Sequence, residues 1–269
     1  MKSVNFLLYF VLSILWVSAS MRDIGEIQDF PFVARLEYND SQICSAGILS
    51  RTLAVTAARC LHEKLWVKLS VCFGTDSNES SSDCLPVTAD VRHPHYNHET
   101  GDFDIAVVAF AKIDFSESVR PLKLYPLPAD HQSNVLVVGW AGGQPNNTNA
   151  SSGSEDVFWT KTQLIDVKDC KNAYESVRPI NPTRMFCTEA NQTDTCLADD
   201  GALLITENEY IALGIVSNKG ACPQPNRPSV FINFHSYEVW HFLKSMMQKF
   251  SERSTKGASR KILPINTSK

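Results

Sequence analysis

The sequence has no second long apolar run after its N-terminal segment. Residues 1–20 contain Lys2, an apolar run over 6–17 and then three small residues, which is the order of a secretory signal peptide. The apolar run is too short to cross about 30 Å of hydrocarbon, which argues against a membrane anchor. We therefore expect a secreted, extracellular protein without a membrane span.

The sequence also lacks the C-x-x-C steps that are typical of zinc sites. An even number of cysteines in a secreted chain favours disulfides, and six N-x-S/T sequons fit the same compartment. The cysteines are Cys44, Cys60, Cys72, Cys84, Cys170, Cys187, Cys196 and Cys222, and the sequons begin at Asn39, Asn78, Asn146, Asn149, Asn191 and Asn266. We expect a disulfide-bonded glycoprotein with no metal and no cofactor.

A strong charge of either sign is missing, because the formal net charge is only −4. We expect no nucleic-acid partner. The charge is nevertheless uneven, since seven Lys or Arg residues follow from Lys244 onward against the single Glu252. We expect residues 251–269 to form a disordered basic tail. A solvated tail is the simpler interpretation, and contact with an acidic partner or glycan is the alternative.

Short apolar and alternating segments dominate what is present, and they predict strands such as 30–36, 135–140 and 157–167. One helix is predicted near the end, over residues 236–250, where Ser236 can cap the first turn. Its apolar side chains recur at helical spacing on one face; they are Val239, Trp240, Leu243, Met247 and Phe250. The prediction is an all-β protein with a C-terminal helix.

Three segments carry a specific resemblance. Residues 44–61 are similar to the C-G-G-S-L-I…V-x-T-A-A-H-C block of trypsin-like serine proteases, and residues 103–110 resemble the N-D-I-A-L-L block of that family. Residues 196–205, C-L-A-D-D-G-A-L-L-I, resemble its nucleophile loop C-x-G-D-S-G-G-P-L-V. With the segments between them, the resemblance to the trypsin/chymotrypsin-like (S1) family extends from about Phe30 to Phe242.

The resemblance implies two six-stranded antiparallel β-barrels of the chymotrypsin type, over about 27–118 and 119–235, with the former active site between them. It also implies the disulfides Cys44–Cys60, Cys170–Cys187 and Cys196–Cys222. The remaining pair, Cys72 and Cys84, flanks a Ser/Asn/Asp-rich loop, and we expect it to form a local bridge.

Two of the three catalytic positions of the family are replaced. Arg59 stands at the histidine position and Asp200 at the serine position, whereas Asp104 retains the triad aspartate; Ala198 replaces an oxyanion-hole glycine. An arginine has no acceptor lone pair and cannot serve as a general base. We expect no functional catalytic residue, and we expect Arg59 to lie near both Asp104 and Asp200.

The former specificity pocket is also altered. Asp194 matches the aspartate that selects Lys or Arg substrates, and Ser217 matches the start of an S-W-G-x-G-C segment. Asn218 and Lys219 replace a tryptophan and a glycine of that segment. A lysine stem would obstruct the pocket and bring its ammonium toward Asp194. We expect a closed, self-filled pocket, and retained peptide binding is the alternative.

The family's activation signal, Ile-Val-Gly-Gly after a basic cleavage site, is absent. In active relatives the new N-terminal amine pairs with the aspartate before the serine, which corresponds to Asp199. Asp199 therefore needs another partner or must face outward, because a buried unpaired carboxylate is costly.

Two groups of residues suggest metal ligands but have simpler interpretations. Asp76, Glu79 and Asp83 are hard-cation ligands in a polar loop, which we interpret as solvated. The histidines at 93, 95 and 98 belong to a segment similar to the family's H-P-x-Y-N.

The predicted function is that of a secreted, non-catalytic serine protease homologue. It would bind an active protease, its substrate or its inhibitor as a regulatory cofactor or decoy, for example in extracellular defence or reproductive fluid. One alternative is a divergent, active endopeptidase of trypsin-like specificity. The other is a glycan- or surface-binding secreted protein.

Overall fold

The computed structural model describes residues 23–25, 27–74, 83–125, 134–140, 157–189, 199–217 and 227–259. Several predictions lie outside these residues: the signal peptide, the Cys196–Cys222 bridge, Ala198 and five sequons, at Asn78, Asn146, Asn149, Asn191 and Asn266. The pocket residues Asp194, Asn218 and Lys219, the acidic residues Asp76 and Glu79 and the side chain of Asp83 also lie outside them.

The first half of the chain forms a closed antiparallel barrel with the strand order β2-β3-β4-β7-β6-β5. Its core contains fully buried side chains from several strands, among them Leu36, Ile48 and Val71. The strands are β2 (Val33–Tyr38), β3 (Ser41–Ser50), β4 (Leu53–Thr56), β5 (Leu69–Phe73), β6 (Asp83–Arg92) and β7 (Ala106–Phe110). Two 3-10 turns, η1 (Ala58–Leu61) and η2 (Trp66–Lys68), connect β4 to β5.

The second half forms a seven-stranded antiparallel sheet in the order β1-β9-β8-β11-β12-β13-β10. A bridge between Leu164 and Thr188 links β10 to the end of β9, so the six strands β8 to β13 enclose a second core. The strands are β1 (Asp23–Gly25), β8 (Asn134–Trp140), β9 (Val157–Gln163), β10 (Met185–Thr188), β11 (Leu203–Thr206), β12 (Ala212–Val216) and β13 (Ser229–Asn233). The predicted fold class is confirmed.

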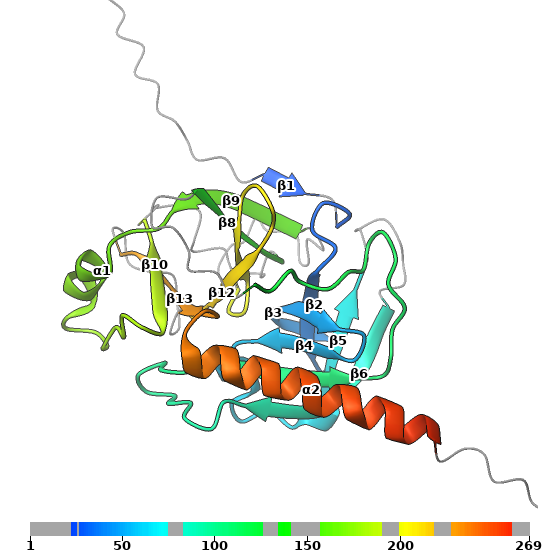
Figure 1. The fold of residues 1–269 in the computed structure, drawn as a ribbon. Helices are drawn as coiled ribbons and strands as arrows, with labels where there is room; N and C mark the ends of the chain where they lie inside the picture. The colour runs from blue at the N-terminus through cyan, green and yellow to red at the C-terminus, as the bar shows by residue number, and fades with distance from the viewer. Residues whose placement is uncertain are drawn as a thin grey trace, which may run out of the picture.

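Two α-helices accompany the barrels. Helix α1 (Val167–Tyr174) begins after Asp166, whose carboxylate accepts a hydrogen bond from the backbone N–H of Lys168. Helix α2 (Tyr237–Ser259) leaves the second barrel after β13 and crosses the first, where it contacts β7 (Figure 1). Val239 and Leu243 are buried, as the predicted apolar face requires.

The predicted end of the last helix was wrong. Helix α2 continues to Ser259 rather than ending near Phe250, so residues 251–259 are helical instead of disordered. The extension contains good helix formers and no proline, and its one glycine is near the end, so local propensity favours continuation. Among the described residues, no helix has the length and apolarity needed to cross a bilayer.

Three of the predicted disulfides are confirmed: Cys44–Cys60, Cys72–Cys84 and Cys170–Cys187. Cys72 and Cys84 lie directly opposite each other in the β5–β6 pair, which explains why this bridge forms locally. Strand β7 of the first barrel ends at Phe110, and strand β8 of the second begins at Asn134. The predicted boundary near residue 118 lies between these two strands.

Candidate functional site

The candidate site lies where the two barrels meet. Arg59 is in η1, directly after β4, and Asp104 lies just before β7, so both come from the first barrel. Asp200 precedes β11 of the second barrel. Its backbone carbonyl accepts a hydrogen bond from the N–H of Ser45 at 3.0 Å, which ties the Asp200 turn to β3.

The structure brings Arg59, Asp104 and Asp200 together, as the sequence predicted for this cluster. The Nε of Arg59 is 2.5 Å from Oδ2 of Asp104 and 3.8 Å from Oδ2 of Asp200. The backbone N–H of Arg59 also donates to Oδ1 of Asp104 at 2.9 Å. Asp104 is fully buried, Arg59 is nearly so, and the Asp200 side chain is 24% exposed. The arginine therefore links two carboxylates from opposite barrels.

Backbone geometry before β7 directs Asp104 into the site. Phe103 adopts a φ of +51°, which is unusual for an aromatic residue. Its ring is held between His93, stacked at 4.3 Å, and the guanidinium of Arg184, 4.4 Å from the ring centre. Arg184 is itself fixed by an ion pair with Asp102 at 2.5 Å. These contacts stabilise the strained residue next to the buried carboxylate.

The two carboxylates of the cluster stabilise the protonated form of Arg59. Burial by itself lowers the pKa of Arg59, but the carboxylates of Asp104 and Asp200 and the hydrogen bond to Asp104 outweigh it and leave that pKa raised. Burial also raises the pKa of the nearby Tyr96 hydroxyl to about 12, with a further contribution from Asp104. Arg59 therefore stays protonated and Tyr96 stays neutral at physiological pH, so neither supplies a general base.

Ser217 is buried and takes part in the same network. Its hydroxyl donates to Oδ2 of Asp104 at 2.8 Å and accepts a hydrogen bond from a terminal nitrogen of Arg59 at 3.4 Å. We predicted Ser217 as a residue of the former specificity pocket. In the structure it is a direct partner of Asp104.

Arg178, in the segment after α1, is a member of the site that sequence reasoning missed. It is 7% exposed, and its NH2 group donates to the backbone carbonyl of Ser217 at 2.8 Å. Its Nε and NH1 atoms have no hydrogen-bond partner among the residues that the structure describes. Burial, followed by repulsion from Arg59, lowers the pKa of Arg178. The site thus contains two arginines and two aspartates, a formally neutral group that we call the charge quartet: Arg59, Arg178, Asp104 and Asp200.

Gly101 allows the two arginines to approach. A Cβ at this position would lie 2.5 Å from NH1 of Arg178 and 3.1 Å from NH2 of Arg59. The residue also has a φ of +69°, which favours glycine. No motif at 178 marked that arginine in the sequence, because its proximity to Arg59 arises only from the packing of the two barrels.

Asp199 has found a partner other than an N-terminal amine. Its Oδ2 accepts a hydrogen bond from the side-chain amide of Gln42 at 2.5 Å. Burial raises the pKa of Asp199 to about 7, although the Gln42 hydrogen bond opposes this shift. We expected Asp199 either to have another partner or to face outward, and the structure shows the first of these.

Two of the histidines that we assigned to the family's H-P-x-Y-N-like segment pack against other rings. The ring of His93 packs between Phe103 and Phe242, whereas His98 stacks on His62 at 3.9 Å. In the described part of the chain, the one cluster with metal-ligand spacing is Glu37 with Cys72 and Cys84. Both sulfurs of that cluster are in a disulfide, so they are not thiolate ligands.

Two antiparallel barrels with an ionic cluster at their junction define a chymotrypsin-like protein. The trypsin family profile matches residues 23–241, and the chain belongs to this family. It is 28% identical over 220 residues to Trypsin 5G1 of Aedes aegypti, covering 80% of each chain. It is 29% identical over 224 residues to human Transmembrane protease serine 11A, covering 78% of this chain and 51% of that protein.

A solved structure gives the same fold. The inactivated protease paralogue S-I1 of the scabies mite superimposes with a TM-score of 0.70 at 20% sequence identity. The match covers 84% of this chain and 98% of that chain. At this identity the likeness establishes the two-barrel fold.

Proposed function

We propose that this protein is a secreted, non-catalytic member of the trypsin family that binds a protein partner. The partner would be an active protease, its substrate or its inhibitor, and the protein would act as a regulatory cofactor or decoy. Secretion is supported by the three disulfides and by the resemblance to trypsins.

The observation that carries the proposal is the ion pair between Arg59 and the buried Asp104. Acyl transfer by this family needs a hydroxyl nucleophile, a base to accept its proton, and donors for the developing oxyanion. The matching positions here hold an arginine and an aspartate. Loss of triad members removes a rate factor on the order of 10⁶. The carboxylate of Asp200 would also repel an oxyanion formed beside it.

A retained scaffold without its chemistry supports a binding role. The charge quartet is held by contacts between the two barrels, so the positions that would otherwise react now stabilise the fold. The scabies mite neighbour is described as inactivated, which is consistent with this interpretation. A glycan-binding role through the basic tail has less support, because residues 251–259 continue a helix and the rest lies outside the described residues.

We expect the purified protein to show no turnover of Lys- or Arg-containing peptide substrates, and Arg59→His alone to show none either. A histidine at 59 would restore a base but would leave Asp200 in place of a nucleophile. The measurement is a sensitive amide-hydrolysis assay, with an active trypsin as positive control. Measurable turnover by the single variant would overturn the non-catalytic assignment.

The binding role is tested separately from the absence of catalysis. The tagged protein is used to capture partners from the fluid into which it is secreted, and proteins enriched over a tagged active-site-blocked trypsin are identified. We expect a protease, a protease substrate or a protease inhibitor among them. Direct binding and the effect on the rate of the active protease are then measured with purified components. Absence of any such partner would contradict the cofactor and decoy roles.

A further inference from the structure

The first barrel carries a contiguous group of exposed apolar side chains. Leu65, Trp66 and Val67 are 60%, 45% and 62% exposed. Single exposed apolar residues are common, whereas contiguous groups mark surfaces that another group covers. The other large apolar side chains exposed in the described residues lie apart in the sequence, at Tyr125, Val177 and Tyr237. We call residues 65–67 the apolar triad.

The triad is held in a fixed conformation. It overlaps the 3-10 turn η2, and the N–H of Lys68 donates to the carbonyl of Leu65 at 2.9 Å. The ammonium groups of Lys64 and Lys68 lie 5.4 and 5.9 Å from the ring centre of Tyr38, at the end of β2. The apolar surface therefore belongs to an ordered turn packed beside the β2–β3 hairpin.

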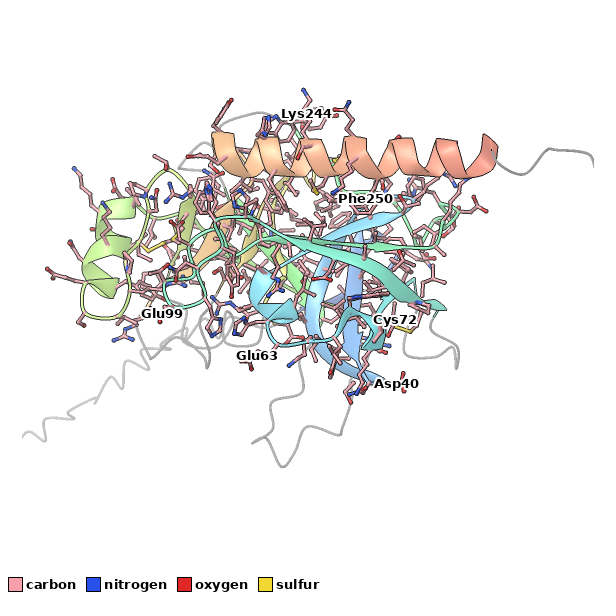
Figure 2. All side chains as sticks on the ribbon, turned by 90° about the horizontal axis from the view of Figure 1, so that it is seen from below. Asp40, Glu63, Cys72, Glu99, Lys244 and Phe250 are labelled. Carbon is pink, nitrogen blue, oxygen red and sulfur yellow. A yellow bond between two sulfur atoms is a disulfide. The ribbon has the colours of Figure 1, made fainter. Side chains whose placement is uncertain are left out.

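A sequon lies beside this turn. Tyr38 pairs with Leu69 in the β2–β5 register, and the N–H of Asn39 donates to the carbonyl of Lys68 at 3.1 Å. Asn39 and Asp40, with φ values of +50° and +59°, form the two-residue hairpin turn before Ser41. All three residues of Asn39-Asp40-Ser41 are exposed. Figure 2 shows Asp40, the middle residue of the sequon, and Glu63, which lies two residues before the triad, on the face opposite α2.

We propose that Asn39 carries an N-linked glycan whose first sugar rings cover the apolar triad and stack on Trp66. In the modification, the amide nitrogen of Asn39 forms a bond to the anomeric carbon of a diphosphate-linked oligosaccharide. The bond from that carbon to the diphosphate breaks, and the amide proton leaves with the diphosphate. Transfer occurs in the secretory pathway, so this inference rests on the secretion included in the proposed function.

Two physical features favour the glycan as the covering group. The hydrogen bond from Asn39 to Lys68 fixes the attachment point two residues from Trp66 along the neighbouring segment. An indole ring offers an apolar face to the C–H groups of a sugar, and covering residues 65–67 removes apolar surface from water.

The first test uses the full chain, including residues 1–20, secreted from eukaryotic cells. Peptide mass spectrometry after enzymatic deglycosylation in heavy-oxygen water reports whether Asn39 was modified. Ser41→Ala removes the sequon but keeps Asn39, and Ser41→Thr is the matched control that keeps the sequon. We expect modification in the wild type and in Ser41→Thr, and none in Ser41→Ala.

The second test measures the covering of Trp66. Acrylamide quenching of tryptophan fluorescence is compared before and after deglycosylation of the folded wild-type protein and of the conservative variant Trp66→Phe. We expect increased quenching in the wild type and no such increase in Trp66→Phe. No increase in the wild type, or the same increase in Trp66→Phe, would overturn the covering role.

The outcomes separate this inference from the proposed function. A chain retained in the cytosol overturns secretion and the glycan together. A secreted chain with unmodified Asn39 overturns only the glycan. If Trp66→Ala then also weakens capture of the protein partner, the triad is assigned to that partner instead.

Discussion

Replacing Arg59 with methionine is expected to lower the free energy of unfolding by about 3–5 kcal/mol. The reason is that Asp104 is fully buried and would lose the guanidinium 2.5 Å from its Oδ2. Among the described residues, it would keep the Ser217 hydroxyl and the backbone N–H at position 59 as hydrogen-bond donors. A buried Asp104 carboxylate without its counterion destabilises the fold far more than the lost packing of the Arg59 side chain does. Chemical denaturation with the disulfides intact measures the change.

Arg178 provides the matched control for this experiment. It is buried to a similar degree as Arg59 but forms no ion pair with the described residues. It donates one hydrogen bond to the Ser217 carbonyl, and its guanidinium lies 5.6 Å from the ring centre of Tyr174. Arg178→Met should therefore lower the free energy of unfolding by only about 1 kcal/mol, the usual contribution of one hydrogen bond. Equal losses for the two arginines would show that burial of the side chain, rather than pairing with Asp104, determines the effect.

A double variant distinguishes the ion pair from general packing. Arg59→Met combined with Asp104→Leu removes both charges, and the remaining charges of Arg178 and Asp200 still sum to zero. Replacing a buried pair with apolar residues is often close to neutral. We expect the double variant to regain most of the stability lost by Arg59→Met alone. An additive loss would contradict the coupling that the geometry implies.

Asp199 is expected to contribute a component of stability that falls as the pH rises from about 4 to about 7, and Asp199→Asn should remove this component. Burial raises the pKa of Asp199 to about 7 in the folded state, above its value near 4 in an unfolded chain. Between these two values the folded state keeps a proton that the unfolded state has released. The folded state is therefore favoured at low pH and loses this advantage as the pH passes through the interval.

The size of this change in stability follows from the difference between the folded and unfolded pKa values of Asp199. A difference of about three pH units corresponds to as much as about 4 kcal/mol in the free energy of unfolding. Above pH 7, Asp199→Asn should be more stable than the wild type by up to this amount, and below pH 4 the two should be equal. Asp114→Asn is the matched control, since that carboxylate is 95% exposed. Parallel pH profiles for the wild type and Asp199→Asn would refute the assignment.

The resemblance assigns Arg59, Asp104 and Asp200 to the three triad positions of the family, and the structure places these three residues together as a charged cluster. Arg59 forms a buried ion pair with Asp104 within the first barrel and reaches Asp200 of the second barrel at 3.8 Å. Asp199, which active relatives pair with a new N-terminus, is held here by Gln42. We infer that the site was retained as a structural junction, which is consistent with the absence of catalysis in the proposed function.

Sequence reasoning succeeded where the determining pattern is local. The alternating segments predicted strands, and the family resemblance implied the two barrels and the bridges Cys44–Cys60 and Cys170–Cys187. The Cys72–Cys84 bridge was predicted from its short polar loop, and strand pairing places these two residues opposite each other. It was wrong about the end of α2, because residues after Phe250 have no strong stop signal and local propensity continues the helix. It missed Arg178, since a single arginine outside a motif carries no sign of its partners.

The sequence by itself determined the identities at positions 59, 104 and 200, and with them the residues on which the proposed absence of catalysis rests. It also determined the strand pattern, because side-chain alternation and motif order depend on neighbouring residues. Only the tertiary structure decided that Arg178 would join Arg59 beside Gly101, that Ser217 would bond to Asp104, and that Gln42 would satisfy Asp199. The reason is physical: these contacts link residues distant in the chain, and their energies depend on burial and distance, which arise only when the two barrels pack together.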